Sequence, residues 1–110
     1  MVENDNKHLD ATFSALSDPT RRAILSRLAL NDLTVTEIAE PYEMSLAAVS
    51  KHIGVLARAK LVSQHKEGRI RRCKLEPAAL NVVANWIGHY QEFWQSNLQS
   101  LEIYVEKLKD

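Results

Sequence analysis

Basic side chains gather between residues 51 and 74, where they could bind a phosphate-rich polyanion. This stretch carries a net charge of +7, and the wider segment 21–75 carries +6, whereas residues 1–20 and 76–110 carry −3 each. The whole chain is neutral, with 14 basic and 14 acidic residues among 110. Because the local field rather than the net charge attracts phosphate, this distribution favours a nucleic-acid ligand that the neutral total would disfavour.

No sequence pattern for catalysis accompanies these charges. The sequence has neither a phosphate-binding glycine loop nor a Gly-x-Ser-x-Gly nucleophile motif. Its single cysteine, Cys73, has no evident histidine and asparagine partners, and one cysteine excludes a disulfide framework or a cysteine-rich zinc module. We therefore expect no enzyme activity and no cofactor.

Three residues bear on a response to metal or oxidation. His89 and Glu92 stand at a His-x-x-Glu spacing, but two ligands do not complete the four of a tetrahedral zinc site. We interpret them as solvated side chains one turn apart on a helix. Cys73 stands among basic residues that would favour its thiolate, although a lone strand cysteine is more often an inert apolar filler. We predict no metal site.

Length and composition indicate one globular domain over residues 1–110. A chain of this length is one domain's worth, and its apolar fraction of 45% is typical of soluble globular proteins. No apolar run has the length of a membrane span, and the acidic start Met-Val-Glu-Asn-Asp does not resemble a secretory signal. These observations predict a cytoplasmic protein.

Capping residues divide the first half of the chain into short helices. Apolar spacing predicts a helix over about 6–16, and Asp18 before a proline predicts the start of a second helix over 19–29. The run Thr34–Glu37 fits a capping box. In this motif the Thr34 side chain accepts a hydrogen bond from the Glu37 N–H, and the Glu37 side chain accepts one from the Thr34 N–H. A short third helix should follow, over about 35–40.

The fourth helix, which Ser45 can cap, has one narrow apolar stripe and an opposite face of small, polar or basic residues. That face presents Ala47, Ala48, Ser50 and Lys51. A short helix, a tight turn and a second helix with such a face predict a helix-turn-helix over about 34–59, whose second helix enters the major groove of DNA. A β-hairpin with a cationic tip at Gly68 should follow as a wing over about 61–75.

A long amphipathic helix is predicted over about 78–107, after Pro77. It would measure ~45 Å, whereas a globule of this length has a radius of gyration of only ~13 Å. Much of its apolar stripe must therefore find a second chain. On this helix the predicted dimer interface comprises Val83, Ile87, Tyr90, Trp94, Leu98, Leu101 and Val105.

This order of elements resembles the ArsR family of bacterial winged-helix repressors over roughly residues 9–105. The resemblance is carried by Leu16–Leu25, Thr34–Ala39, Ser45 with Val49–Ile53 and Leu56, Leu61–Val62 and Glu67–Arg69. It implies a mainly α fold with a small β-hairpin, a winged helix-turn-helix of four helices, two strands and a last helix. It also implies a homodimer, built from the first and last helices, that represses transcription at a palindromic operator. Leu9 and Phe13 of the first helix would then join the dimer interface.

Three positions depart from the family pattern. Gly54 stands where members usually carry Lys or Arg, and Cys73 where an aromatic residue is frequent. Lys60 stands where a glycine usually ends the second helix of the helix-turn-helix, the recognition helix. A non-glycine residue is therefore expected in the left-handed region. The metal-sensing motifs of the family are missing or incomplete: residues 34–44 hold no cysteine, and no Asp-x-His precedes His89.

The sequence thus predicts a homodimeric regulator of double-stranded DNA, a repressor and possible autorepressor without a complete metal site. The expected DNA-binding residues are Ser45, Ala47, Ala48, Ser50, Lys51, His52, Lys66, Arg69 and Arg71, with Arg21, Arg22 and Thr34 as weaker candidates for backbone contacts. Two alternatives stay open. One is a metal- or redox-responsive repressor, and the other is a protein-interaction module that uses the aromatic-rich long helix.

Overall fold

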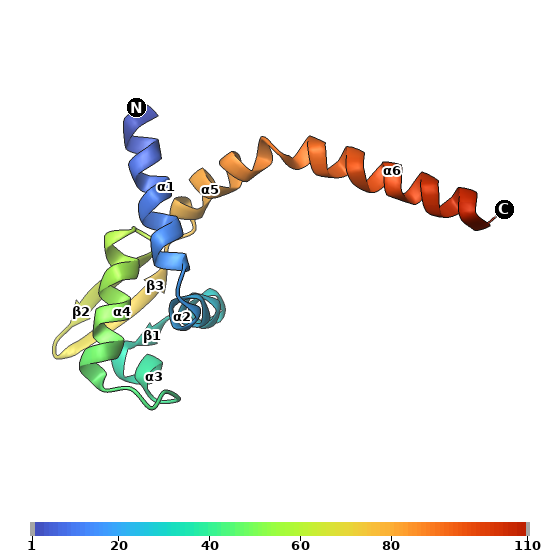
Figure 1. Ribbon diagram of the computed structural model, residues 1–110. Coiled ribbons are helices and arrows are strands. Elements are labelled where there is room, and N and C mark those ends of the chain that lie inside the picture. Colours follow the sequence, from blue (N-terminus) through green and yellow to red (C-terminus); the bar gives the residue numbers. More distant parts are fainter. Residues whose placement is uncertain (1, 110) are drawn as a thin grey trace.

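The computed structural model describes residues 2–109 of the chain, with side chains from residue 6 onwards. Figure 1 shows a body of short helices and a small sheet from which the C-terminal helix projects. The elements are α1 Val2–Leu16, α2 Pro19–Leu30, β1 Leu33–Thr34, α3 Val35–Ala39, α4 Leu46–Arg58, β2 Val62–Glu67, β3 Ile70–Leu75, α5 Ala78–Gly88 and α6 Gln91–Lys109. The expected winged helix-turn-helix is confirmed, with two differences in the order of its elements.

The first difference is a third strand. The sheet has the order β1-β3-β2 with antiparallel pairs, so the second strand of the wing is central. Cys73 on β3 faces Leu33 of β1 on one side and Gln64 of β2 on the other. Strand β1 is only two residues long, too short to show the alternation of apolar and polar residues that identifies a strand in a sequence. Gly68 turns the wing hairpin with φ of 64°, as predicted.

The second difference is a break in the long helix, which was expected to run unbroken over 78–107. At the break, the N–H of His89 donates to the Trp86 carbonyl oxygen (3.2 Å) and that of Tyr90 to the Ile87 carbonyl oxygen (2.9 Å). These three-residue turns are tighter than α-helical ones and redirect the chain directly after Gly88, a residue of low helix propensity. The prediction of one continuous helix was therefore wrong.

The position of α6 gives the chain an extended shape. The molecule spans 66 × 37 × 20 Å, and its Cα radius of gyration is 18.9 Å, well above the ~13 Å of a compact chain of this length. None of the residues of α6 is buried. No helix within the described range 2–109 combines the length and apolar character needed to span a membrane.

The core lies between α2, α3, α4 and the base of the sheet. One side of α4 supplies Val49, Ile53 and Leu56, all at most 1% exposed, which is the narrow apolar stripe seen in the sequence. These side chains pack with fully buried Ile24 of α2 and Ile38 of α3 in one cluster. Burial of this stripe fixes which face of α4 turns outward.

Side-chain caps begin each of the helices that carry the motif. Asp18 Oδ2 accepts a hydrogen bond from the Arg21 N–H (3.0 Å) at the start of α2. At the start of α3, Thr34 Oγ1 accepts from the Glu37 N–H (3.1 Å), while Glu37 Oε1 accepts from the Thr34 N–H (2.8 Å). Ser45 Oγ accepts from the Ala48 N–H (3.1 Å) at the start of α4. The predicted caps are confirmed.

Lys60 ends the recognition helix in the left-handed region, with φ of 62°, as expected from the missing glycine. The N–H of Leu61 donates to the Leu56 carbonyl oxygen and that of Lys60 to the Ala57 carbonyl oxygen, both at 3.0 Å. This pair of bonds is the Schellman arrangement, in which glycine is the usual residue at the left-handed position. A lysine there carries a small conformational strain.

Candidate nucleic-acid interface

The outward face of α4 is made of small, hydroxyl and basic side chains. Ser45, Ala47 and Lys51 are exposed, and Ala48 and Ser50 are partly buried on its flanks. Gly54 and Arg58 continue this face, and the Arg58 guanidinium lies 3.5 Å from where a side chain at Gly54 would begin. Small side chains let a helix approach base edges closely, so this face has the composition of a major-groove reader.

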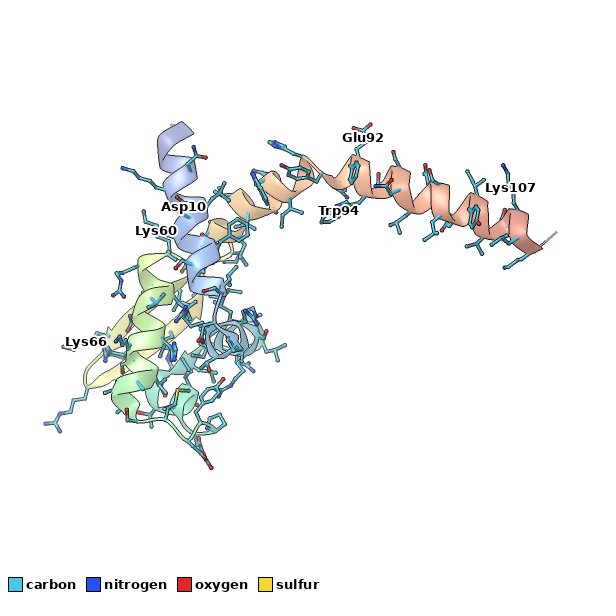
Figure 2. All side chains as sticks on the ribbon, viewed as in Figure 1. Asp10, Lys60, Lys66, Glu92, Trp94 and Lys107 are labelled. Carbon is cyan, nitrogen blue, oxygen red and sulfur yellow. The ribbon has the colours of Figure 1, made fainter. Side chains whose placement is uncertain are left out.

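The wing brings a second set of cations to the same side of the molecule. Lys66, Arg69 and Arg71 are all exposed on β2, the hairpin tip and β3. Figure 2 shows Lys66 on the wing beside α4. The Nε atom of Arg72 lies 3.6 Å from Glu67 Oε1 across the hairpin, so that guanidinium is partly neutralised. The exposed charge at the tip is therefore positive.

A groove of about 320 Å³ separates the start of α4 from the wing. Its walls come from three elements that are distant in the sequence: the start of α3, the first turns of α4 and the start of β3. The lining residues are Thr34, Val35, Thr36, Leu46, Ser50, Arg69, Ile70 and Arg71. Two guanidinium groups and three hydroxyls around one groove form a surface suited to a phosphate backbone.

Arg21 and Arg22 of α2, the weaker candidates for phosphate contacts, have hydrogen-bond partners within the chain. Arg21 Nε donates to the Ala15 carbonyl oxygen (2.7 Å) and its Nη2 to the Ser14 carbonyl oxygen (3.2 Å). Arg22 Nη1 donates to the Leu16 carbonyl oxygen (2.7 Å). Both guanidinium groups therefore satisfy carbonyls at the C-terminal end of α1, where cations are favourable.

His52 lies on the flank of α4 that faces α2 and is partly buried. Its Nδ1 atom is 3.3 Å from Arg21 Nη1 and 3.9 Å from Asp18 Oδ2. The side chain thereby joins the recognition helix to the junction of α1 and α2. This position makes His52 a support for the recognition helix more directly than a ligand for phosphate.

Arg27 is a supporting residue that the sequence analysis missed. Its Nη1 donates to the Ile38 carbonyl oxygen (2.8 Å) and its Nη2 to the Glu37 carbonyl oxygen (3.0 Å), at the C-terminal end of α3. The guanidinium also lies 5.8 Å from the centre of the Tyr42 ring. Its position in the last turn of α2 was visible in the sequence, but its partner helix was not.

The predicted dimer residues divide between the body and the projecting helix. Val83 is only 8% exposed, so it has little free surface to offer an interface. Phe13 and Trp86 meet edge to face at 5.6 Å between ring centres, and Trp86 and Tyr90 at 5.4 Å, joining α1 to α5. All three rings stay partly exposed. Leu9 is half-buried, and the remaining predicted residues, Ile87, Trp94, Leu98, Leu101 and Val105, are exposed.

The candidate residues for metal or redox chemistry are separated. Among the side chains that the structure describes, residues 6–109, no three His, Cys, Asp or Glu come together where they could hold a metal ion. His89 lies at the break after α5 and Glu92 in the first turn of α6, so they do not share one helix as expected. Burial raises the pKa of the Cys73 thiol and outweighs the nearby Arg71, which lowers it. Arg71 favours the thiolate, as expected of a basic neighbour, but burial has the larger effect on the pKa, so the thiol fits the apolar filler of the sequence analysis better than a redox switch.

The geometry defines a class of protein: a winged helix-turn-helix with a cationic wing beside an outward-facing recognition helix. Residues 16–65 match a helix-turn-helix domain family. The chain is 35% identical to the transcriptional repressor SdpR of Bacillus subtilis (strain 168) over 79 residues, which cover 72% of this chain and 88% of SdpR. It is 44% identical over 71 residues to the HTH-type transcriptional regulator Rv2034 of Mycobacterium tuberculosis (strain ATCC 25618 / H37Rv), covering 64% of this chain and 66% of that protein.

Solved structures agree with these relatives. A crystal structure of an ArsR family transcriptional regulator has a TM-score of 0.77 and 41% identity, covering 83% of this chain and 94% of that one. An ArsR-like transcriptional regulator from Rhodococcus sp. RHA1 has a TM-score of 0.70 and 30% identity, covering 90% of this chain and 93% of that one. The chain belongs to the ArsR family of winged helix-turn-helix regulators. It is a DNA-binding transcriptional regulator, not an enzyme.

Proposed function

We propose that two copies of this chain bind a palindromic operator and repress transcription, including that of their own gene. The observation that carries the proposal is the groove between α4 and the wing, which gathers Ser50, Arg69 and Arg71 on one outward surface. The relative SdpR is named as a transcriptional repressor, which supports repression as the outcome. A repressor of this kind would act in the cytoplasm, where bacterial DNA lies.

The division of contacts follows from the chemistry of each surface. We assign Ser45, Ala47, Ala48, Ser50 and Lys51 to the major groove, because their side chains are small or able to hydrogen-bond. The wing cations Lys66, Arg69 and Arg71 are assigned to phosphates or an adjacent narrow minor groove. Thr34 lines the same groove but already accepts a capping hydrogen bond, so it is a secondary contact.

Dimerisation supplies the second half of the interface. The exposed apolar stripe of α6, with Trp94, Leu98 and Leu101, and the ring cluster of α1 and α5 are large apolar surfaces without cover in one chain. A solved relative of the same fold is described as a homodimeric winged helix-turn-helix DNA-binding domain. Two-fold symmetry would set the recognition helices about 34–36 Å apart, with half-sites centred about 10 base pairs apart.

We propose that this regulation needs no metal ion and no cysteine oxidation. Support comes from the separation of His89 and Glu92 and from Cys73, which has no exposed surface. Reactive cysteines are accessible and have a lowered pKa, and Cys73 has neither property. Operator affinity that shifts on adding Zn²⁺, a chelator or peroxide would contradict this part of the proposal.

Selection of binding sites from a random DNA pool tests the proposed function. The full chain should enrich an inverted repeat with half-site centres about 10 base pairs apart, and a copy should lie upstream of its own gene. Enrichment of no sequence over the starting pool, with the protein folded and dimeric, would contradict sequence-specific binding. In that case the exposed aromatic face of α6 would favour a protein-interaction module instead.

A further inference from the structure

Leu46 is an apolar side chain left exposed at the start of the recognition helix. It is the first residue of α4, directly after the Ser45 cap, and is 54% exposed. Three other apolar residues of the helix, Val49, Ile53 and Leu56, are at most 1% exposed. Helical spacing places Leu46 on the side of α4 that carries the core stripe, one turn before Val49. There the stripe extends past the core, and Leu46 lines the groove instead of packing inside.

The surroundings of Leu46 are cationic and polar. Ser50 follows one turn later on the same helix, and Arg69, Ile70 and Arg71 form the opposite wall of the groove. Ile70 is also half exposed, so two branched apolar side chains lie among two guanidinium groups. Phosphate binding explains the two arginines. An exposed leucine does not contribute to phosphate binding, and its contact with water is unfavourable.

One chemical group on the base edges of the major groove is apolar: the C5-methyl group of thymine. We infer that Leu46 contacts a thymine methyl group in each half-site and thereby specifies an A·T pair at that position. The inference rests on the proposed function, since it needs α4 in the major groove. Leu46 is thus a specificity-determining residue, while Arg69 and Arg71 position the protein through the backbone.

The test uses the full chain and the duplex enriched from a random pool. Each thymine of the two half-sites is replaced in symmetric pairs by deoxyuridine, which lacks only the methyl group, and affinity is measured by fluorescence anisotropy. At one symmetric pair of thymines, the affinity of the wild-type protein should fall about fourfold for each methyl group removed. Removing both methyl groups should lower it about fifteenfold. The affinity of the Leu46→Ala variant should fall less than about twofold when the same pair is replaced by deoxyuridine.

Leu30→Ala is the matched control, because Leu30 is an 81% exposed leucine at the end of α2 and does not line the groove. This variant should keep the wild-type response to deoxyuridine. Circular dichroism checks that Leu46→Ala is folded, and the deoxyuridine series on wild-type protein does not depend on any variant.

The outcomes separate this inference from the function on which it rests. If no duplex is enriched, the proposed function fails and the inference fails with it. If an enriched duplex is bound but tolerates deoxyuridine at every position, or if Leu46→Ala keeps the full loss, the regulator binds DNA and the assignment of Leu46 is wrong. Equal weakening of all sequences by Leu46→Ala would likewise overturn it, because that pattern is a backbone contact.

Discussion

Arg21 Nη1 lies 3.3 Å from His52 Nδ1, which joins the start of α2 to the recognition helix. The same guanidinium donates to two carbonyl oxygens of α1, so one side chain connects three helices. Arg21→Ala should therefore lower the free energy of unfolding by about 2 kcal/mol, as expected for hydrogen bonds to a charged group. Urea denaturation followed by circular dichroism measures this change.

Arg69→Ala removes the same charge from the exposed wing and is the matched control. Its free energy of unfolding should stay within about 0.5 kcal/mol of wild type, as for most surface substitutions. Equal effects of the two substitutions would show that Arg21 contributes only charge, contrary to the geometry.

The helix caps make stability depend on acidity. A hydrogen bond from the Arg21 N–H holds the pKa of Asp18 below its ordinary value of 3.8, and one from the Thr34 N–H holds the pKa of Glu37 below its ordinary 4.5. A depressed folded-state pKa adds stability above the ordinary value, which is lost as pH falls through the folded value. We expect the urea midpoint to fall on acidification below about pH 4.5.

Asp18→Asn isolates the first of these caps, because asparagine keeps the accepting oxygen but does not titrate. This variant should lose less stability than wild type between pH 4 and the acid limit of folding. Identical pH profiles for the two proteins would mean that Asp18 has the same pKa in the folded and unfolded states.

Lys60 occupies a backbone conformation with φ of 62° that suits glycine. Lys60→Gly should raise the free energy of unfolding by about 1 kcal/mol, the cost of a left-handed conformation for a residue with a Cβ atom. Lys60→Ala keeps the Cβ atom and should give no such gain. The midpoints of thermal unfolding of wild type, Lys60→Gly and Lys60→Ala measure these differences. A Lys60→Gly variant that is less stable than wild type would show that Lys60 is not strained.

The apolar stripe of α6 should hold the dimer together. Figure 2 shows Trp94 and Glu92 extending from opposite sides of this helix. Leu101 is 57% exposed on the Trp94 side, so Leu101→Asp should yield folded monomers near 12.5 kDa in light scattering. Ile103 is equally exposed, and helical periodicity places it on the other side, so Ile103→Asp should stay dimeric. Dimers of the Leu101→Asp variant would remove α6 from the interface.

The parts of the fold that depend on neighbouring residues were predictable. Thr34 and Glu37 are three residues apart, and their reciprocal hydrogen bonds follow from that spacing. The stripe of α4 identified its buried face because helical periodicity is itself a local property. The ArsR resemblance and the outward face of the recognition helix came from the same kind of signal.

What could not be predicted depends on contacts between distant segments. Strand β1 exists because Leu33 pairs with Cys73, forty residues later in the chain. Arg21 and Arg22 read as exposed cations until the end of α1 is placed beside them. Leu46 was overlooked because a leucine beside a helix cap is usually part of the core, and only its exposure indicates another role.

Positive charge on α4 and the wing should contribute directly to DNA affinity. Lys51→Ala and Arg69→Ala should each weaken binding to the enriched duplex by about 1–3 kcal/mol without loss of folding. Lys107→Ala removes the same charge at the far end of α6, which Figure 2 shows distant from the wing, and should bind like wild type. Equal effects of all three would indicate non-specific attraction.

We propose that the α4 and wing surfaces of two subunits bind DNA together. The most direct test is the affinity of the wild-type protein for the enriched duplex, measured by fluorescence anisotropy over a series of salt concentrations. If each subunit neutralises about four phosphates, log K should fall against log salt with a slope near −7. A slope near zero would contradict the account, because binding would then involve no release of counterions from the phosphate backbone.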